Sequence, residues 1–126
     1  MTKQLGTGSR ILIVEDQVII AMDAEGLLKK HGIDTIDFAM TNEEALSFIA
    51  TARPDAAILD LNLGNTTSLP VAKTLKNLGI PFVFATGFDD RTQIPSELAG
   101  TPVVGKPYSD KELVAGLLRA IAQSSP

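Results

Sequence analysis

Asp55-Ala-Ala-Ile-Leu-Asp60-Leu-Asn-Leu-Gly64 is the stretch that decides the fold class of this chain. Four apolar residues run directly into the carboxylate of Asp60, and turn-forming residues follow. A short apolar run bounded in this way predicts a strand that is buried on both faces. A carboxylate at the C-terminal end of such a strand lies where open α/β sheets bind their ligands. The simpler interpretation is an aspartate that ends a strand and begins a turn. The residues at the ends of the other strands decide between a binding role and a turn role for Asp60.

Length and composition indicate one domain in 126 residues, with 15 acidic and 11 basic side chains and a net charge of −4. The basic residues are scattered, which argues against a nucleic-acid surface. Because the chain contains no cysteine, disulfides and zinc sites of the cysteine type are excluded. No apolar run is long enough to span a bilayer or to act as a signal peptide, so we expect a cytoplasmic protein without a membrane partner.

Apolar runs alternate with amphipathic stretches along the rest of the chain. Strands are expected at 11–14, 34–39, 55–60, 80–85 and 101–104, and helices at 17–30, 41–52, 70–78 and 109–122, with a short or frayed helix within 88–100. Two capping boxes, Thr41 to Glu44 and Ser109 to Glu112, begin two of these helices. A polar loop is expected from Asn62 to Ser68. This order predicts an α/β fold: a single doubly wound (βα)5 domain with a five-stranded parallel sheet.

The domain is expected to occupy residues 10–123, between a flexible N-terminal tail at 1–9 and a C-terminal tail at 124–126. Gly6-Thr-Gly8-Ser9 has a glycine-rich look, but it precedes the first strand and lacks the end of a P-loop. We therefore expect no nucleotide site in this tail.

Polar side chains follow four of the predicted strands, and parallel strands present these ends at one edge of the sheet. They are Glu15, Asp16, Asp60, Thr86 and Lys106. Three clustered carboxylates repel one another, and a divalent cation such as Mg²⁺ with oxygen ligands resolves this. A metal, an ammonium and a hydroxyl around one carboxylate suit phosphoryl transfer, with Asp60 as a nucleophile that forms an acyl phosphate. The alternative is structural: Lys106 neutralises a buried acid cluster and Thr86 caps a strand.

Four short motifs carry a resemblance to a known family: Val14-Glu15-Asp16, Leu59-Asp60-Leu-Asn-Leu-Gly64, Ala85-Thr86-Gly87 and Gly105-Lys106-Pro107. In order and spacing the chain resembles a response-regulator receiver domain of the CheY-like kind, over roughly residues 10–122. The resemblance implies a flavodoxin-like fold and a stand-alone response regulator of a two-component system or phosphorelay, whose output is protein–protein contact.

The same resemblance implies a role for each site residue. Asp60 would accept a phosphoryl group from a phosphohistidine of a sensor histidine kinase or a histidine phosphotransfer protein. Asp16, Asp60 and the main-chain carbonyl of Asn62 would bind Mg²⁺ directly, and Glu15 would act through water. Thr86 and Lys106 would hold the phosphoryl group, and the Lys106–Pro107 bond would be cis.

A narrower likeness concerns Phe84-Ala-Thr-Gly-Phe88, which is similar to the motif of the FAT GUY receivers, mostly single-domain regulators of stress signalling in alphaproteobacteria. Phe88 stands where that motif more often has tyrosine. Many receivers carry an aromatic switch residue at the position of Val103, so the usual switch is in doubt here. Phe88, Val103 and Tyr108 are the switch candidates, and plain packing is the alternative for Phe88.

Several functions remain open beside this one. The chain could act as a phosphate sink or shuttle without an output of its own. An aspartyl-phosphate phosphatase of the haloacid-dehalogenase kind would need a second aspartate where Asn62 stands, together with a cap insertion. A flavodoxin-like binding module would need a phosphate loop where Glu15-Asp16 would repel the phosphate. We therefore expect a protein that catalyses only its own phosphorylation and dephosphorylation, and that is otherwise not an enzyme.

Overall fold

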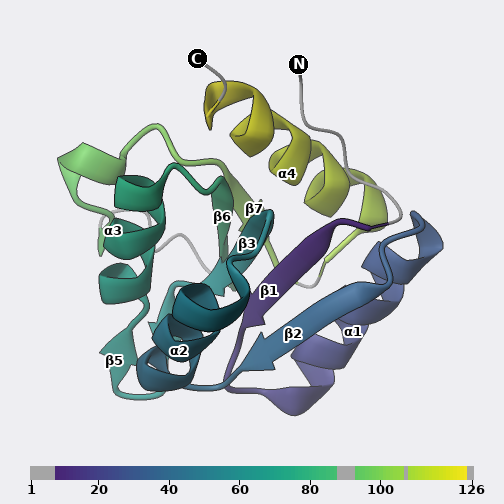
Figure 1. Ribbon diagram of the computed structural model, residues 1–126, viewed down its shortest axis with the longest axis horizontal. Coiled ribbons are helices and arrows are strands. Elements are labelled where there is room, and N and C mark those ends of the chain that lie inside the picture. Colours follow the sequence, from purple (N-terminus) through teal and green to yellow (C-terminus); the bar gives the residue numbers. More distant parts are fainter. Residues whose placement is uncertain (1–7, 88–92, 107, 125–126) are drawn as a thin grey trace.

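The computed structural model describes residues 8–87, 93–106 and 108–124. Its centre is a five-stranded parallel sheet of order β2-β1-β3-β6-β7 (Figure 1). The strands are β1 Arg10–Val14, β2 Thr35–Ala39, β3 Ala56–Asp60, β6 Phe82–Thr86 and β7 Val103–Gly105. The predicted doubly wound α/β class is therefore confirmed, and β3 lies in the middle of the sheet.

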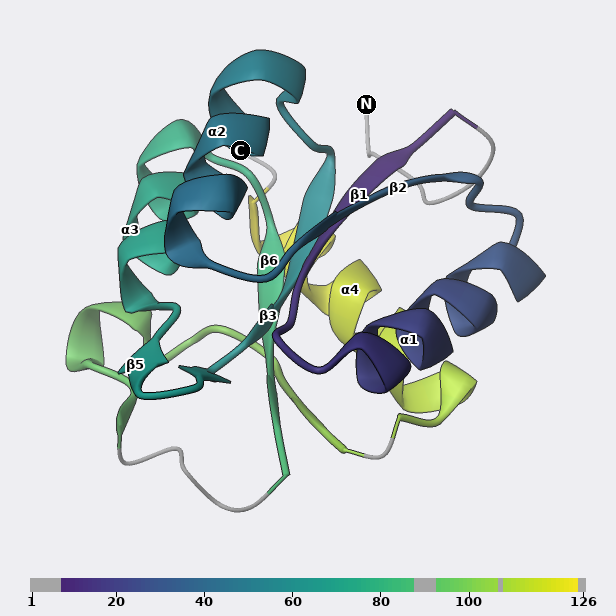
Figure 2. The same cartoon turned by 90° about the horizontal axis from the view of Figure 1, so that it is seen from below.

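In the part of the chain that the structure describes, four helices cover the sheet, two on each face. They are α1 Val18–Lys30, α2 Asn42–Ala52, α3 Leu69–Leu78 and α4 Asp110–Ser124. Figure 2 shows α2 and α3 on one side and α1 and α4 on the other. Because side chains alternate along a strand, Leu12 and Val14 join the cluster under α2 and α3, whereas Ile11 and Ile13 join the cluster under α1 and α4. Each face of the sheet thus has its own apolar core.

The middle strand β3 is buried along its whole length, from Ala56 to Asp60. Ile58 and Leu59 lie on opposite faces and belong to the two different clusters. Full burial of side chains of this size stabilises a fold by about 1.5–3 kcal/mol each. This burial fixes the strand, and with it the position of the carboxylate at its end.

Helix starts follow the predicted capping residues. The Thr41 hydroxyl accepts the N–H of Glu44 at 3.1 Å, and the Glu44 carboxylate accepts the N–H of Met40 at 2.8 Å. At the start of α4, the Ser109 hydroxyl accepts the N–H of Glu112 at 3.2 Å. Local sequence therefore sets where α2 and α4 begin.

The segment after Asp60 differs from the prediction of a polar loop. It forms an antiparallel hairpin of β4 Asn62–Leu63 and β5 Thr66–Thr67. The two residues between these strands are Gly64 and Asn65, and Gly64 adopts a φ of +65°. A glycine-asparagine pair between two short strands is a known hairpin signal, and the prediction missed it because the flanking strands are only two residues long.

The region between β6 and β7 contains a short 3₁₀ helix, η2 Ser96–Leu98, where a short or frayed helix was expected. Residues 88–92 lie outside the described residues, as do the N-terminal residues 1–7 and the Lys106–Pro107 bond with its expected cis geometry. Among the helices of the described ranges, none combines the length and the apolarity needed to cross a membrane.

Candidate functional site

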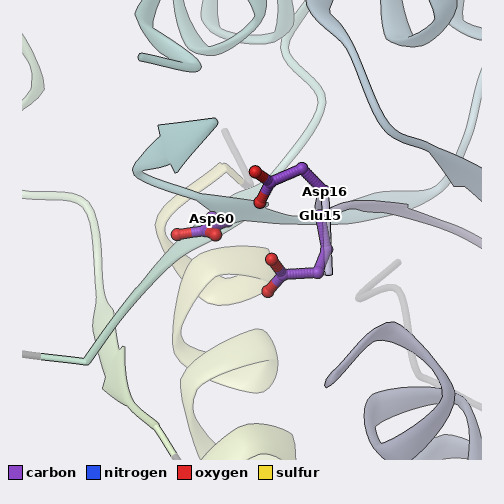
Figure 3. A group of neighbouring side chains, drawn as sticks. All are labelled: Glu15, Asp16 and Asp60. Carbon is purple, nitrogen blue, oxygen red and sulfur yellow. The ribbon is translucent and has the colours of Figure 1, made fainter. Parts of the chain in front are cut away.

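Three carboxylates meet at the C-terminal edge of the sheet. Glu15 and Asp16 directly follow β1, and Asp60 is the last residue of the neighbouring strand β3. Each offers one oxygen, and these oxygens all lie within 4.8 Å of one another. Figure 3 shows the three side chains turned toward a common point. Glu15 and Asp60 are buried and Asp16 is half-buried, so most of the cluster is shielded from solvent.

Lys106 supplies the positive charge of this cluster. It directly follows β7, and its N–H donates to the carbonyl of Thr86 at 2.9 Å. Its ammonium lies 3.0 Å from Oε1 of Glu15 and 3.0 Å from Oδ2 of Asp60. The Lys106 side chain is 12% exposed, and those of Glu15 and Asp60 are 1% and 7% exposed. One largely shielded cation therefore bridges two buried carboxylates.

Main-chain amides fix the remaining carboxylate oxygens. The N–H of Asn62 donates to Oδ1 of Asp60 at 3.2 Å, so each oxygen of Asp60 has a hydrogen-bond donor. The N–H of Gln17 donates to Oε2 of Glu15 at 3.2 Å. These bonds hold both carboxylates in one orientation, and the side chains need little reorganisation before they bind a ligand.

Burial and like charge change the protonation of the cluster. Burial, and then its hydrogen bond with Asp60, raise the pKa of Glu15 to about 7 against the opposing effect of Lys106. Burial lowers the pKa of Lys106, but its hydrogen bonds to Glu15 and Asp60 outweigh this and leave that pKa raised. The lysine is therefore charged at neutral pH, and Glu15 holds a proton part of the time in the metal-free protein.

The donor set fits a hard divalent cation. All three side chains offer carboxylate oxygens, which Mg²⁺ and Ca²⁺ prefer. Lys106 balances one of the three negative charges, and a cation can balance the rest. The hairpin turn borders the cluster, because a Cβ built on Gly64 would lie 3.8 Å from Oδ2 of Asp16. Glu15, Asp16 and Asp60 are therefore the residues that could hold a divalent cation.

The other residues singled out from the sequence lie around this centre. Thr86 is the last residue of β6 and is buried. Val103 begins β7 and packs against the cluster under α2 and α3, whereas Tyr108 packs against the cluster under α1 and α4. Burial, and then the nearby Glu15, raise the pKa of Tyr108. The two switch candidates thus face opposite sides of the sheet, and Phe88 lies outside the described residues.

One residue near the site was missed by the sequence reasoning. Asn42, the first residue of α2, donates its side-chain N–H to the carbonyl of Thr67 in the hairpin. No pattern in the sequence marks this contact, because it joins residues 25 positions apart in two different elements. The Gly64-Asn65 pair could have predicted the hairpin, but it carries no information about the contact between the hairpin and Asn42 of α2.

Comparison with known proteins gives a consistent result. The family model described as response regulator receiver domain matches residues 11–118. The phyllosphere-induced regulator PhyR of Methylorubrum extorquens is 28% identical over 116 residues, which cover 90% of this chain and 43% of that protein. The chain spans about half the length of the curated relatives it matches.

Two solved structures extend the comparison. The solution structure of SdrG from Sphingomonas melonis Fr1 matches with a TM-score of 0.79 and 38% identity, over 95% of this chain and 99% of that one. The structure described as the PhyR stress response regulator matches with a TM-score of 0.79 and 27% identity, over 92% of this chain and 46% of that one.

Proposed function

This chain belongs to the response regulator receiver domain family of two-component signalling, and we propose that it accepts a phosphoryl group on Asp60 in a Mg²⁺-dependent reaction. The observation that carries this proposal is the position of Asp60: a buried carboxylate at the end of the middle strand, within 4.8 Å of two more carboxylates and bridged by Lys106. A purely structural role gives little reason to bury two acids beside a third, half-buried one with only one base to balance them.

In the proposed reaction, one carboxylate oxygen of Asp60 attacks the phosphorus of a phosphohistidine. A phosphorus–oxygen bond forms, the phosphorus–nitrogen bond breaks, and the departing imidazole keeps the electron pair and takes up a proton. Bound Mg²⁺ would neutralise charge on the phosphoryl oxygens. The Lys106 ammonium, already 3.0 Å from Asp60, can move to a phosphoryl oxygen once the carboxylate becomes an acyl phosphate. The Thr86 hydroxyl would donate to another.

The proposal includes the partners and the setting. A sensor histidine kinase or a histidine phosphotransfer protein would supply the phosphoryl group, and the cytoplasmic location belongs to the same proposal. We further propose that the domain signals alone, by protein–protein contact, in a stress response. Support comes from the match over 99% of the SdrG chain and from the structure described as a stress response regulator. The chain would catalyse only its own phosphorylation and dephosphorylation.

Intact-mass measurement with acetyl phosphate tests this function. The wild type should gain the mass of one phosphoryl group with Mg²⁺ and should gain none when the metal is chelated. Asp60→Ala should gain none under either condition, whereas Asp34→Asn, at an exposed residue away from the cluster, should behave as wild type. A gain that persists in Asp60→Ala, or one that ignores Mg²⁺, would overturn the assignment.

A further inference from the structure

Asn42 makes a contact outside its own helix. Its side-chain Nδ2 donates to the main-chain carbonyl of Thr67 at 2.9 Å. Thr67 is the last residue of β5, so this hydrogen bond ties the start of α2 to the hairpin that follows Asp60 (Figure 1). The contact is partly buried, which protects it from competition by water.

Thr67 is connected through the hairpin to the cluster of Glu15, Asp16 and Asp60. Thr67 is paired with Asn62 in the β4–β5 ladder. The N–H of Asn62 donates to Oδ1 of Asp60, and its carbonyl is the expected main-chain ligand of the metal. At the turn of the same hairpin, Gly64 lies near the carboxylate of Asp16, since a Cβ built on Gly64 would be 3.8 Å from Oδ2 of Asp16. A contact that holds Thr67 in place therefore also holds the hairpin, which approaches the carboxylates at Asn62 and at Gly64.

Helix α2 does not need the Asn42 side chain for its own stability. The hydroxyl of Thr41, one residue earlier, already caps the helix. The Oδ1 atom of Asn42 is buried and lacks a hydrogen-bond partner among the described residues. A buried polar atom without a partner lowers stability, and alanine at this position would avoid that cost. The unpartnered Oδ1 atom of Asn42 therefore lowers the stability of the protein. The favourable interaction of this side chain is the hydrogen bond from its Nδ2 to Thr67.

We propose that Asn42 is a positioning residue for the metal and phosphoryl site. It holds the carbonyl of Thr67, and through the β4–β5 pairing it holds the main chain of Asn62 at the distance that Asp60 and a bound Mg²⁺ require. Groups behind the direct ligands of a metal commonly set its affinity in this way. This inference rests on the function proposed above, and it assigns control of the site to a residue of α2.

The test compares N42A with T41A in the full chain. N42A removes the donor to Thr67, whereas T41A removes the cap of the same helix and leaves the hairpin contact in place. Three quantities are measured for each protein: the Mg²⁺ dissociation constant by NMR titration with the metal alone, the amide hydrogen exchange of residues 62 and 68 without metal, and the urea midpoint of unfolding. The N–H groups of residues 62 and 68 donate to Asp60 and Leu61 at the two ends of the hairpin.

We expect N42A to weaken Mg²⁺ binding roughly tenfold and to speed the exchange of the two hairpin amides. T41A should lower the urea midpoint and should leave the metal affinity and the hairpin exchange unchanged. An N42A variant with wild-type affinity and wild-type exchange would refute the role of Asn42. Equal losses in T41A would refute it as well, since helix stability alone would then explain them.

N42D keeps the test decisive if N42A does not fold. Aspartate has a similar size, cannot donate to Thr67, and is favourable in the first turn of a helix. It should show the same faster exchange in the hairpin. A wild type that binds no Mg²⁺ would contradict the proposed function, whereas hydrogen exchange in the metal-free protein would still decide whether Asn42 holds the hairpin.

Discussion

Lys106 places its ammonium nitrogen 3.0 Å from Oδ2 of Asp60, although the two residues are 46 positions apart in sequence. The same nitrogen lies 3.0 Å from Oε1 of Glu15. Both contacts are partly buried, and this lysine determines how much charge the acid cluster can hold without a metal. The cluster's stability, its proton affinity and its chemistry therefore all depend on one side chain.

Replacing Lys106 by methionine should destabilise the fold and abolish phosphorylation. Removing one partner of a buried ion pair leaves an unpaired charge, which costs about 3 kcal/mol or more. The loss should be larger at pH 8 than at pH 6, because Glu15 can take up a proton at the lower pH. Urea unfolding measures the loss. Lys29→Met is the matched control: its partner Glu25 is 3.4 Å away on the surface, and the change should cost about 0.5 kcal/mol or less.

The raised pKa of Glu15 predicts a pH dependence of the metal-free protein. The folded-state pKa of about 7 exceeds the ordinary value of 4.5, so the folded state binds a proton more tightly than the unfolded state. The free energy of unfolding should therefore fall as the pH rises from 4.5 to 7, by up to about 3 kcal/mol, and should level off above. Glu15→Gln should remove this slope. A slope that survives in Glu15→Gln would assign it to another group.

Two serine or threonine residues precede helices, and they should respond differently to alanine. The Ser68 hydroxyl is fully buried and has no partner among the described residues, and it makes no capping bond to α3. Ser68→Ala should leave the free energy of unfolding unchanged or raise it by about 1 kcal/mol. Thr41→Ala removes a capping bond of 3.1 Å and should lower it by about 1 kcal/mol. Chemical unfolding of both variants compares them, and a marked loss in Ser68→Ala would contradict the prediction.

Two helical glycines give a further contrast. A Cβ on Gly116 of α4 would lie 2.8 Å from Cγ2 of Val104, whereas a Cβ on Gly26 of α1 would meet nothing within 4 Å. Gly116→Ala should lower the melting temperature, with a cost of about 1–3 kcal/mol. Gly26→Ala should stabilise the fold by about 0.5–1 kcal/mol. Adding Val104→Ala to Gly116→Ala should recover part of the loss, and a failure to do so would show that another contact limits the helix.

The strand ends show why so much of the site was readable from the sequence. Asp60 and Lys106 each follow a short apolar run, and parallel strands leave no choice about which edge such residues share. Periodicity therefore predicted the cluster before any distance was known. The capping residues Thr41 and Ser109 were equally readable, because the partner of each lies three residues away.

Contacts between distant segments were not readable in this way. Whether Asn42 of α2 would lie beside Thr67 depends on how the helix packs on the sheet and on the shape of the hairpin. Neither leaves a periodic signal. The same holds for Gly116, whose close approach to Val104 depends on how α4 packs on the sheet. Sequence patterns describe each element on its own, whereas these contacts arise from how the elements pack together.

The separation of 91 positions between Glu15 and Lys106 also matters while the chain is being synthesised. Glu15, Asp16 and Asp60 leave the ribosome long before the lysine that neutralises them, and β7 must join the sheet before Lys106 can reach them. A nascent chain therefore carries an unbalanced acidic cluster until its last strand is in place. Under the function proposed above, the chain would become able to accept a phosphoryl group only when this strand is in place, so an unfinished copy would not draw phosphoryl groups away from finished ones.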